Sequence, residues 1–243
     1  MTTAASEVSS DAKSRSGRSS AVLRAVKPLA VMVLWIALCS LGAGRLNWIP
    51  GWICAGVYVV GVIVAGTVVK RLNKGLMEAR SEWRRHPMTK FDKIALAIYF
   101  PLTLLQPFVG GLDGGRFHWL PISEWAIVPG VVLFLAAMGL VAWTMATNPF
   151  AEATVRIQTE RGHCVVMAGP YRFVRHPMYL GMILMYPAMA LMLGSGWAMV
   201  IAGTMAFLIV WRTAKEDAFL TRELSGYQGF TAHTRFRLIP GLW

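Results

Sequence analysis

Long apolar stretches separated by short polar segments dominate the sequence from residue 28 onward. A run of about 20 apolar residues is long enough to cross the hydrocarbon core of a bilayer as a helix. The pattern therefore predicts an all-α integral membrane protein with about six transmembrane helices. Their expected ranges are 28–44, 48–69, 94–109, 125–146, 177–193 and 197–211.

The last two apolar stretches are short and are joined by Gly194-Ser195-Gly196. At ~1.5 Å per residue, each falls short of a ~30 Å bilayer core. We therefore expect a tight helical hairpin near the C-terminus, with its second helix continuing out of the membrane. If the hairpin is a single re-entrant unit, the number of spans is five.

Charge gives the predicted helices an orientation. The segments 1–27, 70–93, 148–175 and 212–243 hold every Lys and Arg except Arg45 and Arg116. Since cytoplasmic loops carry an excess of basic residues, we expect both termini in the cytoplasm and the protein in the inner (plasma) membrane. The glycine-rich run 110–115 follows no predicted strand, so we expect a flexible outer turn there and no phosphate-binding loop.

Composition narrows the class of protein. The chain is 56% hydrophobic and 15% charged, whereas about a quarter of the residues of soluble proteins are charged. A net charge of +12 could indicate a nucleic-acid partner, but its placement between apolar spans favours the membrane instead. The three cysteines show no metal-ligand spacing, so no metal site is predicted. Nearly uncharged spans argue against an ion pathway in a transporter.

Three regions follow from these patterns. Residues 1–27 are polar and basic with little to bury, which is typical of a disordered tail. Residues 28–147 hold the N-terminal transmembrane helices. Residues 148–243 contain the cofactor loop, the helical hairpin, and a cytoplasmic C-terminal helix and tail.

The most informative stretch is 169–181, with the sequence GPYRFVRHPMYLG. Pro177 disfavours helix for the preceding residue and suits a first helical turn, so a helix should begin there. Arg175 and His176 then lie at the positive end of a helix, which favours an anion such as a carboxylate. The simpler alternative is a basic anchor that flanks a membrane helix.

The motif in this stretch, GPYR followed by RHPxYxG, resembles the signature of the isoprenylcysteine carboxyl methyltransferase and phospholipid methyltransferase superfamily. The resemblance covers about residues 148–243, including the segments 148–150, 155–158, 161–163, 212–217 and 237–243. It differs at Asp217, where the family often has a second glutamate. The resemblance implies an integral-membrane enzyme that uses S-adenosyl-L-methionine.

The resemblance also implies a site. We expect Arg175 and His176 to bind the cofactor's carboxylate, and Glu216 or Asp217 to bind its ammonium or ribose. Tyr171, Tyr179 or Phe150 would line the adenine. The predicted cofactor-binding residues are Gln158, His163, Gly169, Tyr171, Arg175, His176, Pro177, Tyr179, Gly181, Glu216 and Asp217, and the predicted catalytic residues are Glu216 and Arg212. Arg212 and Glu216 share a helix face, so a plain surface ion pair is the alternative for them.

The acceptor is expected to be a hydrophobic or lipid-linked molecule taken from the bilayer. Carboxylate O-methylation of the isoprenylcysteine type is favoured, and N-methylation of a phospholipid amine is the alternative. A membrane enzyme similar to the sterol reductases, which bind NADPH, is a further alternative.

Overall fold

The computed structural model describes residue 30 and residues 33–82 and 88–243, so the predicted disordered tail 1–27 lies outside the described residues. Regular structure in this described part of the chain is helical, apart from an isolated bridge between Pro121 and Ser195. The predicted all-α fold is thus confirmed.

The helices follow the apolar pattern closely. After a short helix at Val33–Ala43, the chain forms α2 (Ile49–Leu72), α3 (Lys74–Ser81), α4 (Lys90–Gly110), α5 (Ile127–Thr147), α6 (Pro177–Met192), α7 (Gly196–Glu223) and α8 (Tyr227–His233). Short helical turns lie at Gly111–Phe117, Glu124–Ala126, Thr159–Arg161 and Gly169–Arg172.

Four described segments are long and apolar enough to cross a membrane, namely Ile49–Leu72, Lys90–Phe117, Glu124–Thr147 and Gly196–Glu223. The apolar helices Val33–Ala43 and Pro177–Met192 are shorter. The structure therefore supports a membrane protein, while the choice between five and six spans stays a prediction.

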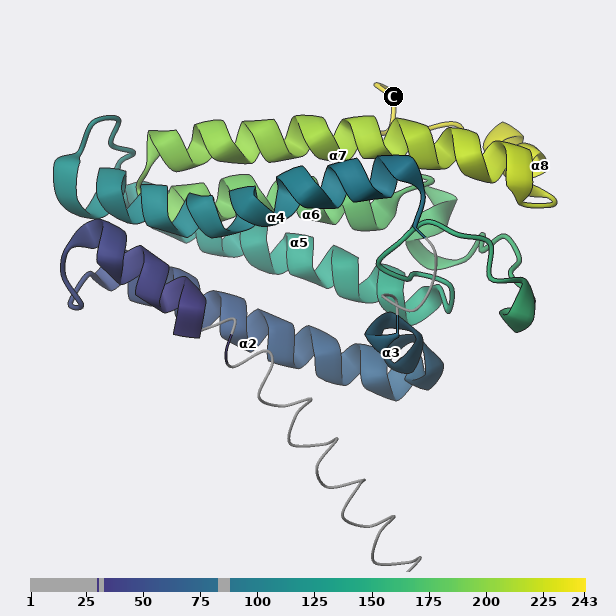
Figure 1. Cartoon of the computed structure of the whole chain (residues 1–243), viewed down its shortest axis with the longest axis horizontal. Coiled ribbons are helices and arrows are strands. Elements are labelled where there is room, and N and C mark those ends of the chain that lie inside the picture. The colour runs from purple at the N-terminus through teal and green to yellow at the C-terminus, as the bar shows by residue number, and fades with distance from the viewer. Residues whose placement is uncertain (1–29, 31–32, 83–87) are drawn as a thin grey trace, which may run out of the picture.

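The long helices run side by side along the molecule (Figure 1). α5 packs against α2 and α6, and α7 packs against α6 and α4. Contact between α5 and α6 is close at Gly181, where an added Cβ would lie 2.6 Å from the Val141 side chain and 3.0 Å from the Ala137 carbonyl oxygen. α6 and α7 form the helical hairpin that the sequence predicts.

The glycine-rich run 110–115 is not a flexible turn, and that prediction is wrong. It continues α4 as a π-helical turn, Gly111–Phe117. Gly111 packs so closely on the first helix that an added Cβ would lie 2.2 Å from the Cys39 carbonyl oxygen. The buried Asp113 carboxylate accepts hydrogen bonds from the Ser195 hydroxyl at 2.6 Å and from the Leu120 amide at 2.8 Å. These contacts tie the turn to the start of α7.

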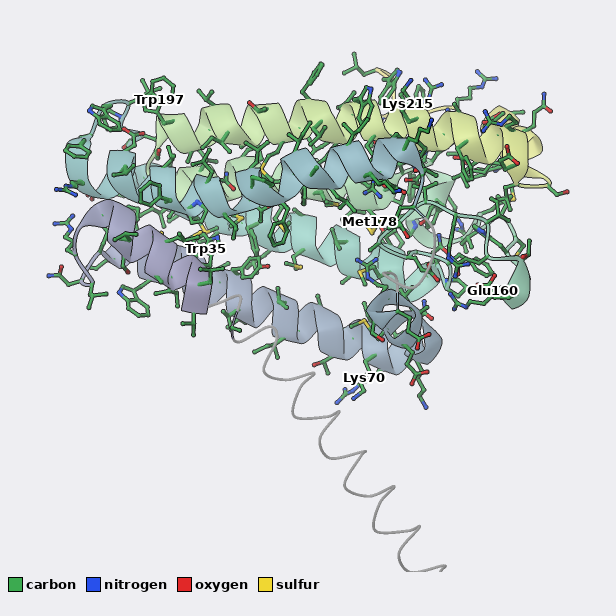
Figure 2. The ribbon with its side chains drawn as sticks, viewed as in Figure 1. Trp35, Lys70, Glu160, Met178, Trp197 and Lys215 are labelled. Carbon is green, nitrogen blue, oxygen red and sulfur yellow. The ribbon has the colours of Figure 1, made fainter. Side chains whose placement is uncertain are left out.

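Charged side chains of the described residues gather at one end of the bundle. Lys70, Glu160 and Lys215 lie toward this end, and Trp197 lies at the other (Figure 2). α2, α5 and α7 end here, and α4 and α6 begin here. The loop between α5 and α6 and the C-terminal tail therefore meet above the same helix ends.

Candidate functional site

α6 begins at Pro177, as the sequence predicts, with His176 at its N-cap. The residues before it are held by the C-terminal tail. The Arg175 amide donates to the Phe236 carbonyl and the His176 amide to the Arg237 carbonyl, both at 2.9 Å. The tail therefore sets the direction in which the Arg175 and His176 side chains leave the backbone.

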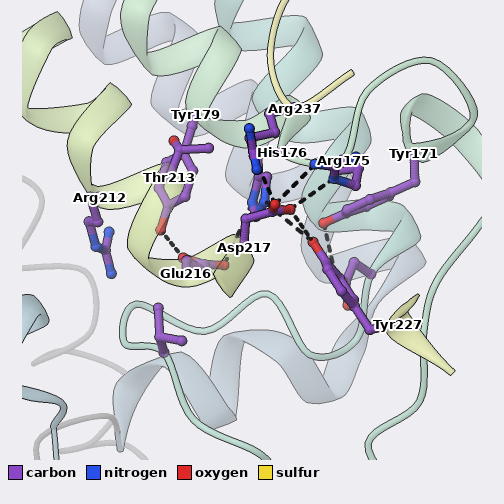
Figure 3. A network of polar contacts seen from close by, with 12 residues as sticks. Tyr171, Arg175, His176, Tyr179, Arg212, Thr213, Glu216, Asp217, Tyr227 and Arg237 are labelled. Carbon is purple, nitrogen blue, oxygen red and sulfur yellow. Dashed lines mark hydrogen bonds and ion pairs between the residues drawn. The ribbon is translucent and has the colours of Figure 1, made fainter. Parts of the chain in front are cut away.

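Asp217 on α7 is the centre of a buried polar network (Figure 3). Its carboxylate accepts hydrogen bonds from Arg175 Nε at 2.8 Å, Arg237 Nε at 2.8 Å and the Tyr227 hydroxyl at 3.0 Å. His176 Nε2 lies 3.2 Å from the same carboxylate. Burial and the Asp217 charge raise the pKa of Tyr227, which keeps its hydroxyl protonated as a donor. The network joins α6, α7, α8 and the tail.

Arg175 is fully engaged within this network. Besides two bonds to Asp217, its Nη1 donates to the Thr234 carbonyl at 3.0 Å and to the Arg235 carbonyl at 2.8 Å. Only 7% of the residue is exposed. Its guanidinium thus positions protein groups, and in this arrangement it has little left to offer the carboxylate of a cofactor.

Arg212 and Glu216 lie on an adjoining part of α7 and each binds another element. Glu216 accepts a hydrogen bond from the Tyr179 hydroxyl at 2.5 Å. Arg212 pairs with Asp92 at the start of α4 at 2.7 Å, and it donates to the Ala153 carbonyl at 3.0 Å. Its guanidinium also lies over the Tyr179 ring, 5.3 Å from the centroid. The two residues are therefore parts of a larger polar site.

A pocket opens between α6, α7, α8 and the loop from α5 to α6. One part of its wall is apolar and aromatic, with Phe150, Tyr171, Leu220, Leu224 and Phe230. The other part is charged or polar, with Thr154, Tyr179, Arg212 and Glu216. Such a pocket fits a ligand that has a flat aromatic group and a charged end.

Thr154 is unusual within this pocket. The residue is only 5% exposed, and its hydroxyl oxygen has no hydrogen-bond partner among the described residues. Leaving a buried hydroxyl unpaired costs free energy, so native proteins normally satisfy such groups. A bound polar ligand would supply the missing partner.

The loop supplies a second aromatic surface. The Phe150 ring lies against the His163 ring at a centroid distance of 4.5 Å, and His163 Nδ1 accepts a hydrogen bond from the backbone amide of Gln158 at 3.3 Å. Burial and the nearby Arg156 charge lower the pKa of His163, so the neutral imidazole is favoured.

Seven of the predicted site residues line the pocket: His163, Tyr171, Arg175, His176, Tyr179, Arg212 and Glu216. Gln158, Gly169, Pro177, Gly181 and Asp217 do not line it. Gln158 instead donates to the Phe150 carbonyl at 2.8 Å, which shapes the loop. Gly169 has φ +58°, and an added Cβ there would lie 2.7 Å from the Thr147 hydroxyl oxygen. These five residues therefore belong to the structure around the pocket and not to its lining.

Sequence reasoning missed several residues of the site. Leu220 and Leu224 follow Glu216 at steps of four, so their shared helix face was a usable signal. Asp92, the acid directly before an apolar span in a basic segment, was a second signal. Thr154 carries no sequence signal, because its importance comes only from burial without a partner.

Comparison with known proteins places this site in a family. Residues 125–225, which include all of α5, α6 and α7, match the model of the phospholipid methyltransferase family. No curated protein matches the chain. The matched segment holds Thr154, Tyr171, Tyr179, Arg212 and Glu216 of the pocket. Residues 125–225 therefore match a family of the isoprenylcysteine carboxyl methyltransferase and phospholipid methyltransferase type.

Proposed function

We propose that this protein is a membrane enzyme that binds S-adenosyl-L-methionine in the pocket and methylates a hydrophobic or lipid-linked acceptor. Carboxylate O-methylation of the isoprenylcysteine type is the first candidate. The observation that carries the proposal is the pocket itself, which joins an aromatic wall to a charged end within the matched domain.

The residues present fit the cofactor. The adenine matches the slot between Phe150, Tyr171 and Leu224, and Thr154 offers an unpaired hydroxyl to a polar group. Glu216 offers a carboxylate to the ammonium or ribose. His176 Nδ1 lies 3.9 Å from Glu216, beside the start of α6, where the helix dipole favours a negative group. Arg212 and His176 thus replace Arg175 as the groups nearest to a bound carboxylate.

When bound, S-adenosyl-L-methionine supplies a methyl group attached to a sulfonium sulfur, and attack by an acceptor oxygen or nitrogen on that methyl group releases the sulfur as a neutral thioether. The protein's part is positioning and electrostatics. Arg212 is held in place by Asp92 and the Ala153 carbonyl, so its guanidinium needs no further ordering when a ligand binds. Tyr179 holds Glu216 in one orientation.

Phospholipid N-methylation is the second candidate, and Glu216 favours it. An amine acceptor must lose a proton, whereas a carboxylate acceptor need not. Glu216 lines the pocket with one oxygen bonded to Tyr179, so the other could take that proton.

The positive-inside rule supports a cytoplasmic location for the pocket. The pocket lies at the end of the bundle where the basic side chains gather (Figure 2). A soluble cofactor would then enter from the cytosol of a cell whose inner membrane holds the protein, and the acceptor from the bilayer.

Ligand-dependent unfolding of the detergent-purified protein tests the cofactor. A ligand that binds only the folded state raises the unfolding temperature by mass action. S-adenosylhomocysteine should raise it, and NADPH should not. The reverse result would place the protein with the reductases and overturn the proposal.

A further inference from the structure

A second cavity adjoins the pocket. Arg212, Glu152 and Met178 line both cavities, so they form the partition between them. Away from this partition the second cavity lies between α4, α6 and α7, with apolar walls from Leu96, Met182 and Leu208. All three side chains are partly exposed, on helices whose outer faces are apolar. The cavity therefore combines apolar walls with charged residues at one end, which suits an apolar chain with a polar head group.

Arg80 lies at the polar head of this cavity. It comes from α3, outside the segment that matches the methyltransferase family. Its Nη1 donates to the Ala151 carbonyl at 2.6 Å, and Arg212 Nη2 donates to the Ala153 carbonyl at 3.0 Å. The two guanidinium groups therefore bind carbonyl groups that lie two residues apart in the same short loop segment.

Arg80 differs from the other charged residues at this head. Arg212 is paired with Asp92, and Glu152 is paired with Arg156 at 2.9 Å. Arg80 has no ion pair among the described residues, and its guanidinium carries more N–H donors than its bond to Ala151 uses. Burial lowers the pKa of Arg80, and the nearby Glu152 charge acts against this. Arg80 therefore has guanidinium donors left to bind a ligand in the cavity.

We propose that Arg80, beside Arg212, binds the anionic group of the acceptor at the head of this cavity, with the acceptor's apolar chain between α4, α6 and α7. The inference rests on the proposed function and deepens it. The ligand is an amphiphile whose acidic group contains the reacting atom, if it is a carboxylate, or lies next to it, if it is a phosphate diester. The partition through Arg212 would let the acceptor head meet the methyl donor, while Arg80 selects for the anion.

The test measures binding without cofactor, using detergent-purified full-length protein and two pairs of probes. The first pair is N-acetyl-S-farnesylcysteine and its uncharged methyl ester. The second pair is dioleoylphosphatidylethanolamine and dioleoylglycerol, which lacks the phosphate. The variants are Arg80→Gln, which keeps a donor for the Ala151 carbonyl, and Arg80→Lys, which keeps the charge. Arg222→Gln is the matched control, because Arg222 is an exposed arginine at the same end of the bundle.

The wild type should prefer the member that carries the acidic group in at least one pair, and that pair identifies carboxylate or phosphate as the source. Arg80→Gln should reduce this preference by about ten- to hundredfold, the value of a charge-assisted hydrogen bond. Arg80→Lys should keep most of it, and Arg222→Gln should keep all of it.

Two results would overturn the inference: a wild type without preference in either pair, or an Arg80→Gln variant with undiminished preference. The first needs no variant, so the inference can fail even if Arg80→Gln does not fold. Binding of S-adenosylhomocysteine is measured separately on each protein. Its absence from the wild type would refute the proposed function while leaving the anion preference measurable.

Discussion

Asp92 and Arg212 are 120 positions apart in the chain, yet their side chains form an ion pair at 2.7 Å. Asp92 is completely buried, and its other oxygen accepts from the Val155 amide at 2.7 Å. One carboxylate from α4 thus fixes both the proposed catalytic arginine and the pocket loop. The N-terminal half of the chain therefore helps to build the site that the matched domain contains.

Replacing Asp92 should be strongly destabilising. Asp92→Ala leaves Arg212 buried without its counter-charge, and loss of one partner of a buried pair costs about 3–5 kcal/mol. Denaturant unfolding in detergent measures this. Glu78→Gln, at an exposed position of α3, should change the free energy of unfolding by less than about 0.5 kcal/mol. Equal stability of the two variants would contradict the structural role of the pair.

Arg175→Ala should act mainly on stability. The change removes four hydrogen bonds and leaves Asp217 with a smaller share of compensating charge. We expect a loss of about 3–5 kcal/mol, with Arg175→Lys intermediate because lysine lacks the planar fork. If Arg175→Ala unfolds like the wild type but binds S-adenosylhomocysteine more weakly, Arg175 is a ligand for the cofactor after all.

Substitutions of Thr154 test whether its hydroxyl contacts the ligand or serves only in packing. Thr154→Val removes an unpaired buried hydroxyl at nearly constant shape, so the ligand-free protein should be as stable as the wild type or more stable by about 1 kcal/mol. Affinity for S-adenosylhomocysteine should fall by about two- to tenfold. Thr154→Ser keeps the hydroxyl and should keep the affinity. Unchanged affinity in Thr154→Val would exclude the hydroxyl as a ligand contact.

His163 predicts a pH dependence of stability. Its folded-state pKa is below the ordinary value of 6.5, because burial and Arg156 disfavour the charged form. Between these two pKa values the unfolded chain binds more protons than the folded one. The free energy of unfolding should therefore fall as the pH drops below 6.5, and this contribution should level off below the folded-state pKa. His163→Gln should lack this component in unfolding measured between about pH 5 and 8.

Thiol labelling of whole cells tests the orientation. Cys164 is an exposed cysteine at the site end, and Arg116 is exposed at the opposite end. An impermeant reagent should leave Cys164 unmodified and should label Arg116→Cys in a Cys164→Ser background. Gly114 is unsuitable, since a side chain there would meet the Leu193 carbonyl oxygen at 2.1 Å. Labelling of Cys164 from outside would place the pocket on the outer side.

The helical architecture was predictable because each apolar stretch is continuous and each break is polar or contains proline. The start of α6 at Pro177 was correct for this reason. The error at 110–115 arose because glycine permits turns and also permits close packing of helices. Only the position of Cys39 in the folded protein decides between these two uses.

The candidate site was predictable in part. The signature around Arg175 and His176 located the pocket, since the chain brings α6, α7 and the loop between α5 and α6 together there. The partners of individual charges were not predictable. Four-residue spacing suggested that Arg212 pairs with Glu216, but Asp92 and Tyr179 compete for them across the bundle. Charges choose partners by distance in the folded protein, and sequence spacing gives only the local candidates.

The shortness of α6 has a consequence for how the proposed enzyme would meet its acceptor. Sixteen residues span only ~24 Å, less than a ~30 Å bilayer core, so α6 cannot extend from one membrane surface to the other. A lipid acceptor could then reach the site by diffusing in the plane of its leaflet. Turnover would follow the mole fraction of acceptor in the membrane, and adding inert lipid would slow the enzyme even at a constant bulk concentration.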